Sequence, residues 1–158
     1  MTNNSLMNDI WCDRTPLSGS WTPSEYLFDS RSEELMTAAI DSIAGLGSNW
    51  DGYGAMAFAP EVVQAARVFA NAIAEWIPLP AVVPVPNGAI QFEWKVGERE
   101  LEFELSANGV IRYLKWSPSE GIEEEGEFDS DDLVQSKILV SWLSLGRKKC
   151  KPSPAAPR

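Results

Sequence analysis

Residues 90–116 read IQFEWKVGERELEFELSANGVIRYLKW, and this stretch decides the fold. Large apolar residues alternate with polar ones around Phe92 and again around Phe103. A period of two is typical of a strand with one buried face. Gly97 and the pair Asn108-Gly109 provide turn residues between the runs. The stretch predicts a three-stranded antiparallel meander with one face on a core and one face in water. The three runs are 90–95, 100–105 and 110–116.

Helical periodicity precedes the predicted strands. Ser30 and Glu33 form a capping box, and the apolar spacing that follows predicts a helix over 31–45. Pro60 is suited to a first helical turn and starts a second apolar stripe, which should continue until Pro78. Between this helix and the meander, residues 81–86 contain two prolines that restrict them to a sheet edge or a connector.

The region after the meander is acidic and then helical again. Residues 117–130 are expected to form an acidic loop, and Ser130 is expected to cap a last helix. The sequence therefore predicts an α+β fold in the order α-α-β-β-β-α. The inner stripe of the last helix is expected to be Val134, Ile138, Ser141, Trp142 and Leu145.

Three regions of the 158-residue chain differ in composition. Residues 1–29 show neither helical nor strand periodicity and are expected to form an irregular arm that docks through its aromatic side chains. Residues 30–146 carry the patterned segments and should form one α+β domain. Residues 147–158 are basic and proline-rich, which predicts a disordered tail.

The charge distribution favours a protein partner over nucleic acid or a membrane. The chain has 23 acidic and 13 basic residues and a formal net charge of −10. Five of the basic residues follow Leu145 and none of the acids does, so the rest of the chain is more negative still. Such a body repels nucleic acid and anionic membranes and attracts basic protein surfaces. Solubility alone is the simpler interpretation.

The cysteines and the start of the chain indicate the compartment. Cys12 and Cys150 belong to no metal-binding or redox spacing, and we interpret both as free thiols in a reducing environment. The first residues lack a signal-peptide pattern, and no apolar run is long enough to span a membrane. A cytoplasmic location is expected.

No catalytic constellation is recognisable. The chain contains no histidine, which removes histidine bases, nucleophile pairs and metal ligands. Glu93-x-Lys95 on a strand is the pattern of a magnesium-dependent nuclease. That chemistry also requires an aspartate from a neighbouring strand, and none occurs between Asp51 and Asp129. We therefore predict no enzyme activity, no cofactor and no metal, with the nuclease as an alternative.

The most distinctive local sequence is NWDGYGA at residues 49–55. Asn and Asp can accept bonds from the backbone two residues on, and the glycines can adopt positive φ, so a tight loop is predicted. Trp50 and Tyr53 would be buried or presented by this loop, together with Asp51. A structural connector between helices and a binding loop are both open interpretations. A calcium site is excluded, because the loop lacks the carboxylate spacing that calcium binding requires.

These features together resemble a widespread group of small bacterial and phage proteins. The resemblance is carried by the NWDGYGA loop, the proline-started helix and the pairing of QFEW at 91–94 with LEFE at 101–104. It covers roughly residues 40–114. It implies a similar fold and an origin in phages, mobile elements or defence neighbourhoods, and it carries no catalytic residue across.

The resulting hypothesis is a non-enzymatic inhibitor of a basic, nucleic-acid-handling protein, such as an anti-CRISPR-like phage product or an antitoxin. Regularly spaced carboxylates would imitate a nucleic-acid backbone. A structural assembly subunit is a further alternative, and a merely solvated sheet face is the simplest one. The predicted partner-binding residues are Glu93, Glu100, Glu102, Glu104, Glu123, Glu124, Glu125, Trp50, Asp51 and Tyr53.

Overall fold

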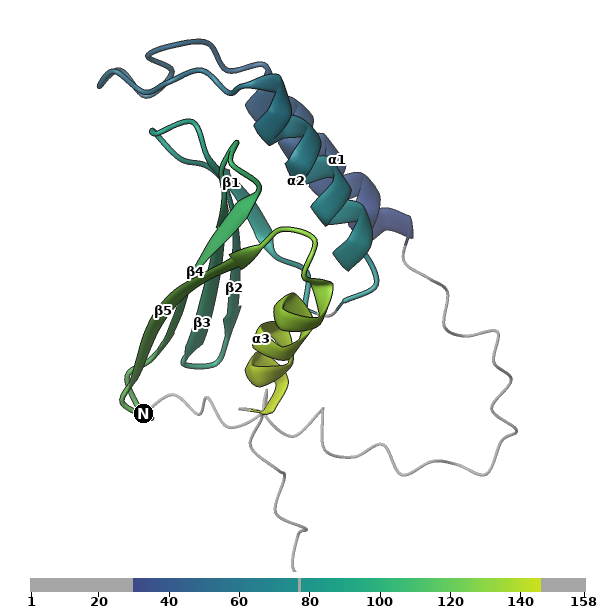
Figure 1. The fold of residues 1–158 in the computed structure, drawn as a ribbon, viewed down its shortest axis with the longest axis vertical. Coiled ribbons are helices and arrows are strands. Elements are labelled where there is room, and N and C mark those ends of the chain that lie inside the picture. Colours follow the sequence, from purple (N-terminus) through teal and green to yellow (C-terminus); the bar gives the residue numbers. More distant parts are fainter. Residues whose placement is uncertain (1–29, 77, 146–158) are drawn as a thin grey trace, which may run out of the picture. The chain divides into compact units, whose positions relative to one another are not determined.

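The computed structural model describes residues 30–76 and 78–145, which form an α+β fold (Figure 1). In these residues the order of elements is two helices, five strands and a last helix. Their bounds are α1 Ser30–Ala44, α2 Pro60–Ile73, β1 Ala81–Pro84, β2 Ile90–Val96, β3 Arg99–Leu105, β4 Val110–Ser117, β5 Ile122–Asp129 and α3 Leu133–Leu145.

The predicted three-stranded meander is wrong, because the described residues form a five-stranded antiparallel sheet in the order β1-β2-β3-β4-β5. The three predicted strands correspond to β2, β3 and β4. The proline-containing segment expected at an edge or connector is the edge strand β1, which pairs with β2. The sheet therefore has one additional strand on each side of the predicted meander.

The segment expected as an acidic loop is largely the strand β5, which pairs with β4 along its whole length. A turn at Pro118–Gly121 reverses the chain, and Gly121 has a φ of 64° that favours glycine. The alternation in β5 is hidden because Glu124 and Gly126 occupy inward positions where apolar residues would mark a strand. Glutamate is also depleted in strands generally, although a charged edge strand resists pairing with other chains.

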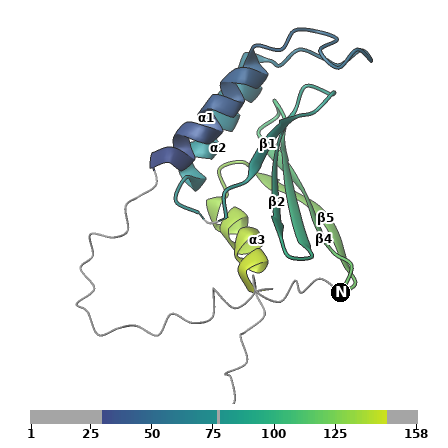
Figure 2. The ribbon, with the colours of Figure 1, turned by 180° about the vertical axis from the view of Figure 1, so that it is seen from behind.

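The helices lie on one side of the sheet, as Figures 1 and 2 show from opposite directions. α2 and α3 both contact β2 and β3, whereas α1 packs on α2 and β1. We call the side of the sheet turned toward the helices the inner face and the other side the outer face.

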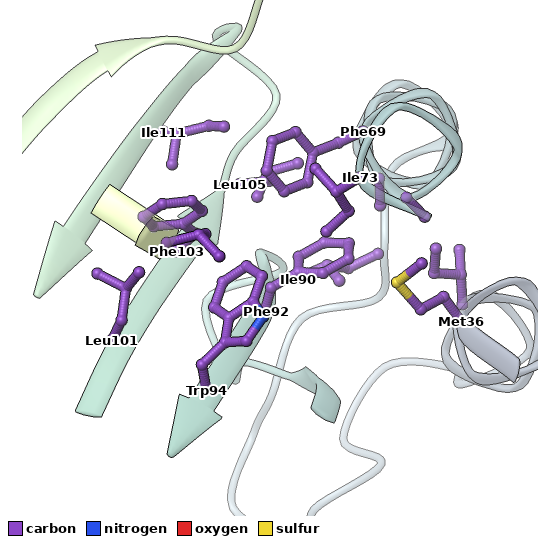
Figure 3. Packing of buried hydrophobic residues seen from close by; sticks show 14 of the residues in the cluster. Met36, Phe69, Ile73, Ile90, Phe92, Trp94, Leu101, Phe103, Leu105 and Ile111 are labelled. Carbon is purple, nitrogen blue, oxygen red and sulfur yellow. The ribbon is translucent and has the colours of Figure 1, made fainter. Parts of the chain in front are cut away.

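The core lies between the inner face and the helices (Figure 3). Phe92 and Phe103 are fully buried, and the Phe103 ring lies 5.0 Å from the Trp94 ring between centroids. Phe69 of α2 meets Phe92 edge-on at 5.2 Å. Burying such rings supplies much of the apolar stabilisation of a small domain. Phe92, Trp94 and Phe103 are buried, as the alternation in 90–95 and 100–105 predicts, and Trp50 of the NWDGYGA loop is half-buried.

The helices follow their predicted bounds with two differences. α1 agrees with the prediction to within one residue, but α2 ends at Ile73, earlier than expected. The last helix starts later than expected, at Leu133, where Asp132 Oδ1 accepts a bond of 2.9 Å from the backbone N–H of Gln135. Asp132 therefore caps α3 in place of Ser130.

The predicted inner stripe of α3 is wrong except at Trp142, which is half-buried and packs against the core. Val134, Ile138 and Leu145 are exposed, with 72%, 59% and 78% of their surface accessible. The helix is apolar nearly all round, so helical spacing alone does not identify the packed side. The residues of α3 that are buried against the sheet are Ser136, Leu139, Val140 and Leu143.

The predicted arm at 1–29, the tail at 147–158, Cys12 and Cys150 lie outside the described residues. Among the residues that are described, no helix is both long and apolar enough to cross a bilayer.

Candidate functional site: the acidic outer face

The outer face consists of three rows of side chains that run across β2, β3, β4 and β5. Strand pairing sets each row, because directly opposed residues point to the same side of an antiparallel sheet. Neighbouring rows are about 7 Å apart along the strands. The first row is Gln91, Glu104, Arg112 and Glu127; the middle row is Glu93, Glu102, Leu114 and Glu125; the third row is Lys95, Glu100, Trp116 and Glu123.

Cations of the chain itself neutralise the first and third rows in part. Arg112 Nη1 lies 3.7 Å from Glu104 Oε1 in the first row. Lys95 and Glu100 form an ion pair in the third row. Among the described residues of the middle row there is no lysine or arginine, and Gln91 donates to Glu93 at 3.1 Å and to Glu102 at 2.9 Å instead. The middle row thus carries the least neutralised charge.

Glu102 is the carboxylate most affected by this arrangement. Partial burial is the first cause that raises its pKa, and repulsion from Glu93 and Glu100 raises the pKa further, with a smaller effect of Glu104. The hydrogen bond from Gln91 acts in the opposite direction. A raised carboxyl pKa means that the negative charge is unfavourable where it stands. A cation above the middle row would relieve this repulsion.

Apolar side chains of β4 form the floor between the acidic strands β3 and β5. Leu114 is half-buried, and Trp116 is 38% exposed. A hollow of about 370 Å³ lies over the first and middle rows, and an adjoining hollow of about 270 Å³ lies over the middle and third rows. Glu102, Leu114 and Glu125 line both hollows. The outer face therefore combines acidic walls with an apolar floor.

Glu124 lies on the inner side of β5, apart from its neighbours Glu123 and Glu125. It accepts hydrogen bonds from the Tyr113 hydroxyl at 2.9 Å and from Lys115 Nζ at 3.0 Å. The bond from Lys115 and then the bond from Tyr113 lower the pKa of Glu124. The predicted acidic set is thus divided between the two faces, and Glu124 already has a cation.

Lys115 belongs to a small cationic cluster beside α3. Its Nζ lies 5.0 Å from the centre of the Trp142 ring, and the Arg99 guanidinium lies 4.8 Å from the same ring. Arg99 also pairs with Glu120 and donates to the Trp142 carbonyl. Cations over an indole ring are attracted to its electron-rich face. This cluster holds the end of α3 against the inner face.

The NWDGYGA loop is fixed by its own side chains. Asp51 Oδ1 accepts bonds from the N–H groups of Tyr53 at 2.8 Å and Ala55 at 3.1 Å, and Asn49 Oδ1 accepts from Gly54 at 2.7 Å. The bond from the Tyr53 backbone is the main cause that lowers the pKa of Asp51. Asp51 therefore closes the loop through its own side chain.

The rings of this loop have different surroundings. Trp50 packs on Phe58 with ring centroids 6.2 Å apart, as a structural connector requires. Tyr53 is 94% exposed at the loop tip. The loop is joined to the β1–β2 turn by a bond of 2.9 Å from Met56 N–H to the Pro86 carbonyl. In the same turn, Asn87 donates to Glu104 of the outer face at 3.2 Å.

The described geometry gives no support to the nuclease alternative. Glu93 and Lys95 do share the outer face, but Lys95 is paired with Glu100. Within residues 30–76 and 78–145, no group of three acidic or thiol side chains is arranged to hold a metal ion. Two-metal or one-metal hydrolysis needs such a ligand set.

Sequence reasoning missed several residues of the outer face. It did not select Arg112, Leu114 and Trp116, because each of the two alternate sets of residues in Val110–Ser117 mixes apolar and polar side chains and neither is marked as the buried one. It also missed Glu127, which was assigned to a loop. The apolar side of β3 is unambiguous, so the pairing of β4 with β3 would have shown which residues of β4 face outward.

Comparison with known proteins adds no relative, since the chain matches no family model, no curated protein and no solved structure. The class of protein is therefore defined by the fold and the surface alone. It is an α+β domain with helices on one face of an antiparallel sheet and a carboxylate-rich outer face.

Proposed function

We propose that this chain is a non-enzymatic interaction protein of the cytoplasm, which binds a basic protein through its outer face and inhibits it. The partner belongs to the class of nucleic-acid-handling effectors. A phage-borne inhibitor of host defence or an antitoxin is the setting in which such a chain would act. Neither a cofactor nor a metal takes part.

One observation carries the proposal, namely the imbalance of charge across the three rows. Seven glutamates face outward with only Lys95 and Arg112 among them in the described rows. Like charges on directly opposed positions, such as Glu93 and Glu102, destabilise a sheet. Solubility needs no such clustering, because mixed charges serve it equally well. A surface that attracts a basic partner gains encounter rate from the clustering.

The regular spacing of the carboxylates supports a nucleic-acid-handling partner. Glu100, Glu102 and Glu104 follow one another on alternate positions of β3, about 7 Å apart. A protein surface that binds a nucleic acid carries cations matched to a regular series of negative charges. Rows of carboxylates at regular intervals would occupy that surface and exclude the nucleic acid.

Capture by charge-matched variants tests the proposal. The full chain would be used as bait in its native cell in three forms: wild type, Glu102→Lys with Glu125→Lys, and Glu34→Lys with Glu61→Lys. The last pair lies exposed on α1 and α2 and changes the net charge equally. We expect wild type and the helix variant to retain the same basic protein and the outer-face variant to lose it.

Salt provides a second criterion in the same experiment. Exposed charges are screened beyond about 8 Å at physiological ionic strength, so retention should weaken as salt rises above about 0.15 M. Equal retention by the outer-face and helix variants would contradict the proposal. A wild-type bait that retains no basic protein would contradict it as well.

A further inference from the structure

The chain contains its own example of an arginine that stands on β4 between the acidic strands β3 and β5. Arg112 of β4 stands between Glu104 of β3 and Glu127 of β5 as their direct cross-strand neighbour. Its guanidinium reaches Glu104 at 3.7 Å and is largely exposed. On this face a guanidinium that rises from β4 thus reaches a carboxylate of the neighbouring strand β3.

The middle row repeats this arrangement without the arginine. Glu102 and Glu125 flank β4 as Glu104 and Glu127 do, but the residue between them is Leu114. A leucine is shorter than an arginine and ends below the carboxylates, and both hollows are open above it. An arginine from another molecule could enter there and lay its apolar stem on Leu114.

Trp116 supplies the feature that separates arginine from lysine. It follows Leu114 on the same face and lines the smaller hollow together with Glu102 and Glu125. A guanidinium is planar, stacks on aromatic rings and binds carboxylates through two parallel bonds, whereas an ammonium is a compact, strongly hydrated point charge. Trp142 on the inner face already carries the Arg99 guanidinium 4.8 Å from its ring centre.

We propose that the middle row of the outer face is a docking site for an arginine side chain of an extended basic segment, with the guanidinium between Glu102 and Glu125 and beside the Trp116 ring. This inference rests on the proposed function and specifies the chemistry of the partner. Because successive rows are about 7 Å apart, alternate residues of an extended segment match them.

Two matched peptides test the docking site directly. One alternates arginine with threonine and the other alternates lysine with threonine, both with blocked ends, and each is titrated against the full chain by calorimetry at low salt. We expect the arginine peptide to bind about five-fold tighter than the lysine peptide, which is the size of a cation–π contribution at an exposed site. Equal affinities would overturn the proposal.

Variants of the row locate the preference. Trp116→Leu should reduce the difference between the peptides to what the carboxylates alone provide, while Trp116→Phe should keep more of it because a ring remains. Glu102→Gln with Glu125→Gln should lower the affinity for the arginine peptide by about ten-fold, because the charge-assisted bonds are lost. Glu34→Gln with Glu61→Gln is the control for net charge. A preference for arginine that is unchanged in Trp116→Leu would overturn the assigned role of the ring.

The two proposals fail in distinguishable ways. If the peptides bind equally but capture of the cellular partner is still lost in the Glu102→Lys, Glu125→Lys variant, the arginine site is wrong and the proposed function stands. If the arginine preference follows Trp116 as described but capture is indifferent to the outer face, the docking site stands and the proposed function is wrong.

Discussion

The two faces of the sheet are built from alternate residues of the same strands but differ in packing and charge. Along β3, Leu101, Phe103 and Leu105 point to the helices and are fully buried or nearly so. The intervening Glu100, Glu102 and Glu104 point outward and repel one another. The inner face is thus packed, and the outer face is open and only partly neutralised.

The difference separates stability from recognition. Free energy of folding depends on the aromatic packing of the inner face, where removing a ring leaves a cavity. Replacing the exposed carboxylates of β5 on the outer face, Glu123, Glu125 and Glu127, should change stability by less than about 0.5 kcal/mol. The separation of charge from packing supports the proposed interaction through the outer face.

The largest expected effect comes from the inner face. Phe103→Ala should lower the free energy of unfolding by about 3–5 kcal/mol, since the ring is fully buried against Phe69, Trp94 and Phe128. The neighbouring substitution Glu102→Gln should change it far less, because it keeps the length of the side chain and leaves no cavity. Urea titration of both variants measures the contrast. Similar losses in the two would show that the faces are not divided in this way.

A smaller effect is expected where β5 meets β4. A Cβ added to Gly126 would lie 2.6 Å from Tyr113 Cε1, because the Tyr113 ring crosses over the glycine to reach Glu124. Gly126→Ala should therefore cost about 1–3 kcal/mol through displacement of the ring.

Gly47→Ala is the control for this substitution, since nothing lies within 4 Å of the added atom. It should leave the midpoint of thermal unfolding nearly unchanged. If Gly126→Ala also leaves the midpoint of thermal unfolding unchanged, the Tyr113 ring does not pack over Gly126 in the way described.

The smallest expected effects are pH-dependent and have opposite signs on the two faces. The pKa of Glu102 is raised above its ordinary 4.5, so its ionisation costs stability as pH rises through the raised pKa. Glu102→Gln should be slightly more stable than wild type at about pH 7 and equal to it at about pH 3.

Glu124 behaves in the opposite way. Its pKa is lowered below 4.5, so it contributes stability that is present above its ordinary pKa and is lost as pH falls through the lowered pKa. Glu124→Gln should be less stable than wild type at about pH 7, and the deficit should close in acid. Chemical denaturation of both variants across this pH range gives the two signs, and the same sign for both would contradict the assignment of Glu124 to the inner face.

The sequence was sufficient to predict the mixed α+β class and the inner residues of β2 and β3, because Phe92 and Phe103 stand in clear alternation. It was insufficient for β5, where Gly126 and Glu124 replace the apolar residues that would mark an inward position. Glycine is tolerated there only because Tyr113 from the neighbouring strand covers it, which is a tertiary contact.

The candidate site shows the same dependence on tertiary contacts. Alternation placed Glu100, Glu102 and Glu104 together correctly, since they share one strand. It wrongly grouped Glu124 with Glu123 and Glu125, because residues 122–129 were expected to form a loop, and a loop does not point alternate side chains to opposite faces of a sheet. On α3, where apolar residues surround the helix, only the packing against the sheet decides that Leu139 is buried and Ile138 is exposed.

The indole N–H signals of the tryptophans test most directly whether the outer face is the contact surface. Trp116 is the indole of the outer face, whereas Trp94 donates to the Pro78 carbonyl at 2.9 Å on the inner side. In nitrogen-15 spectra, with Trp116→Phe to assign the signal, addition of the captured basic protein should shift the Trp116 signal and leave that of Trp94 in place. A shift of Trp94 with an unmoved Trp116 would contradict recognition through the outer face.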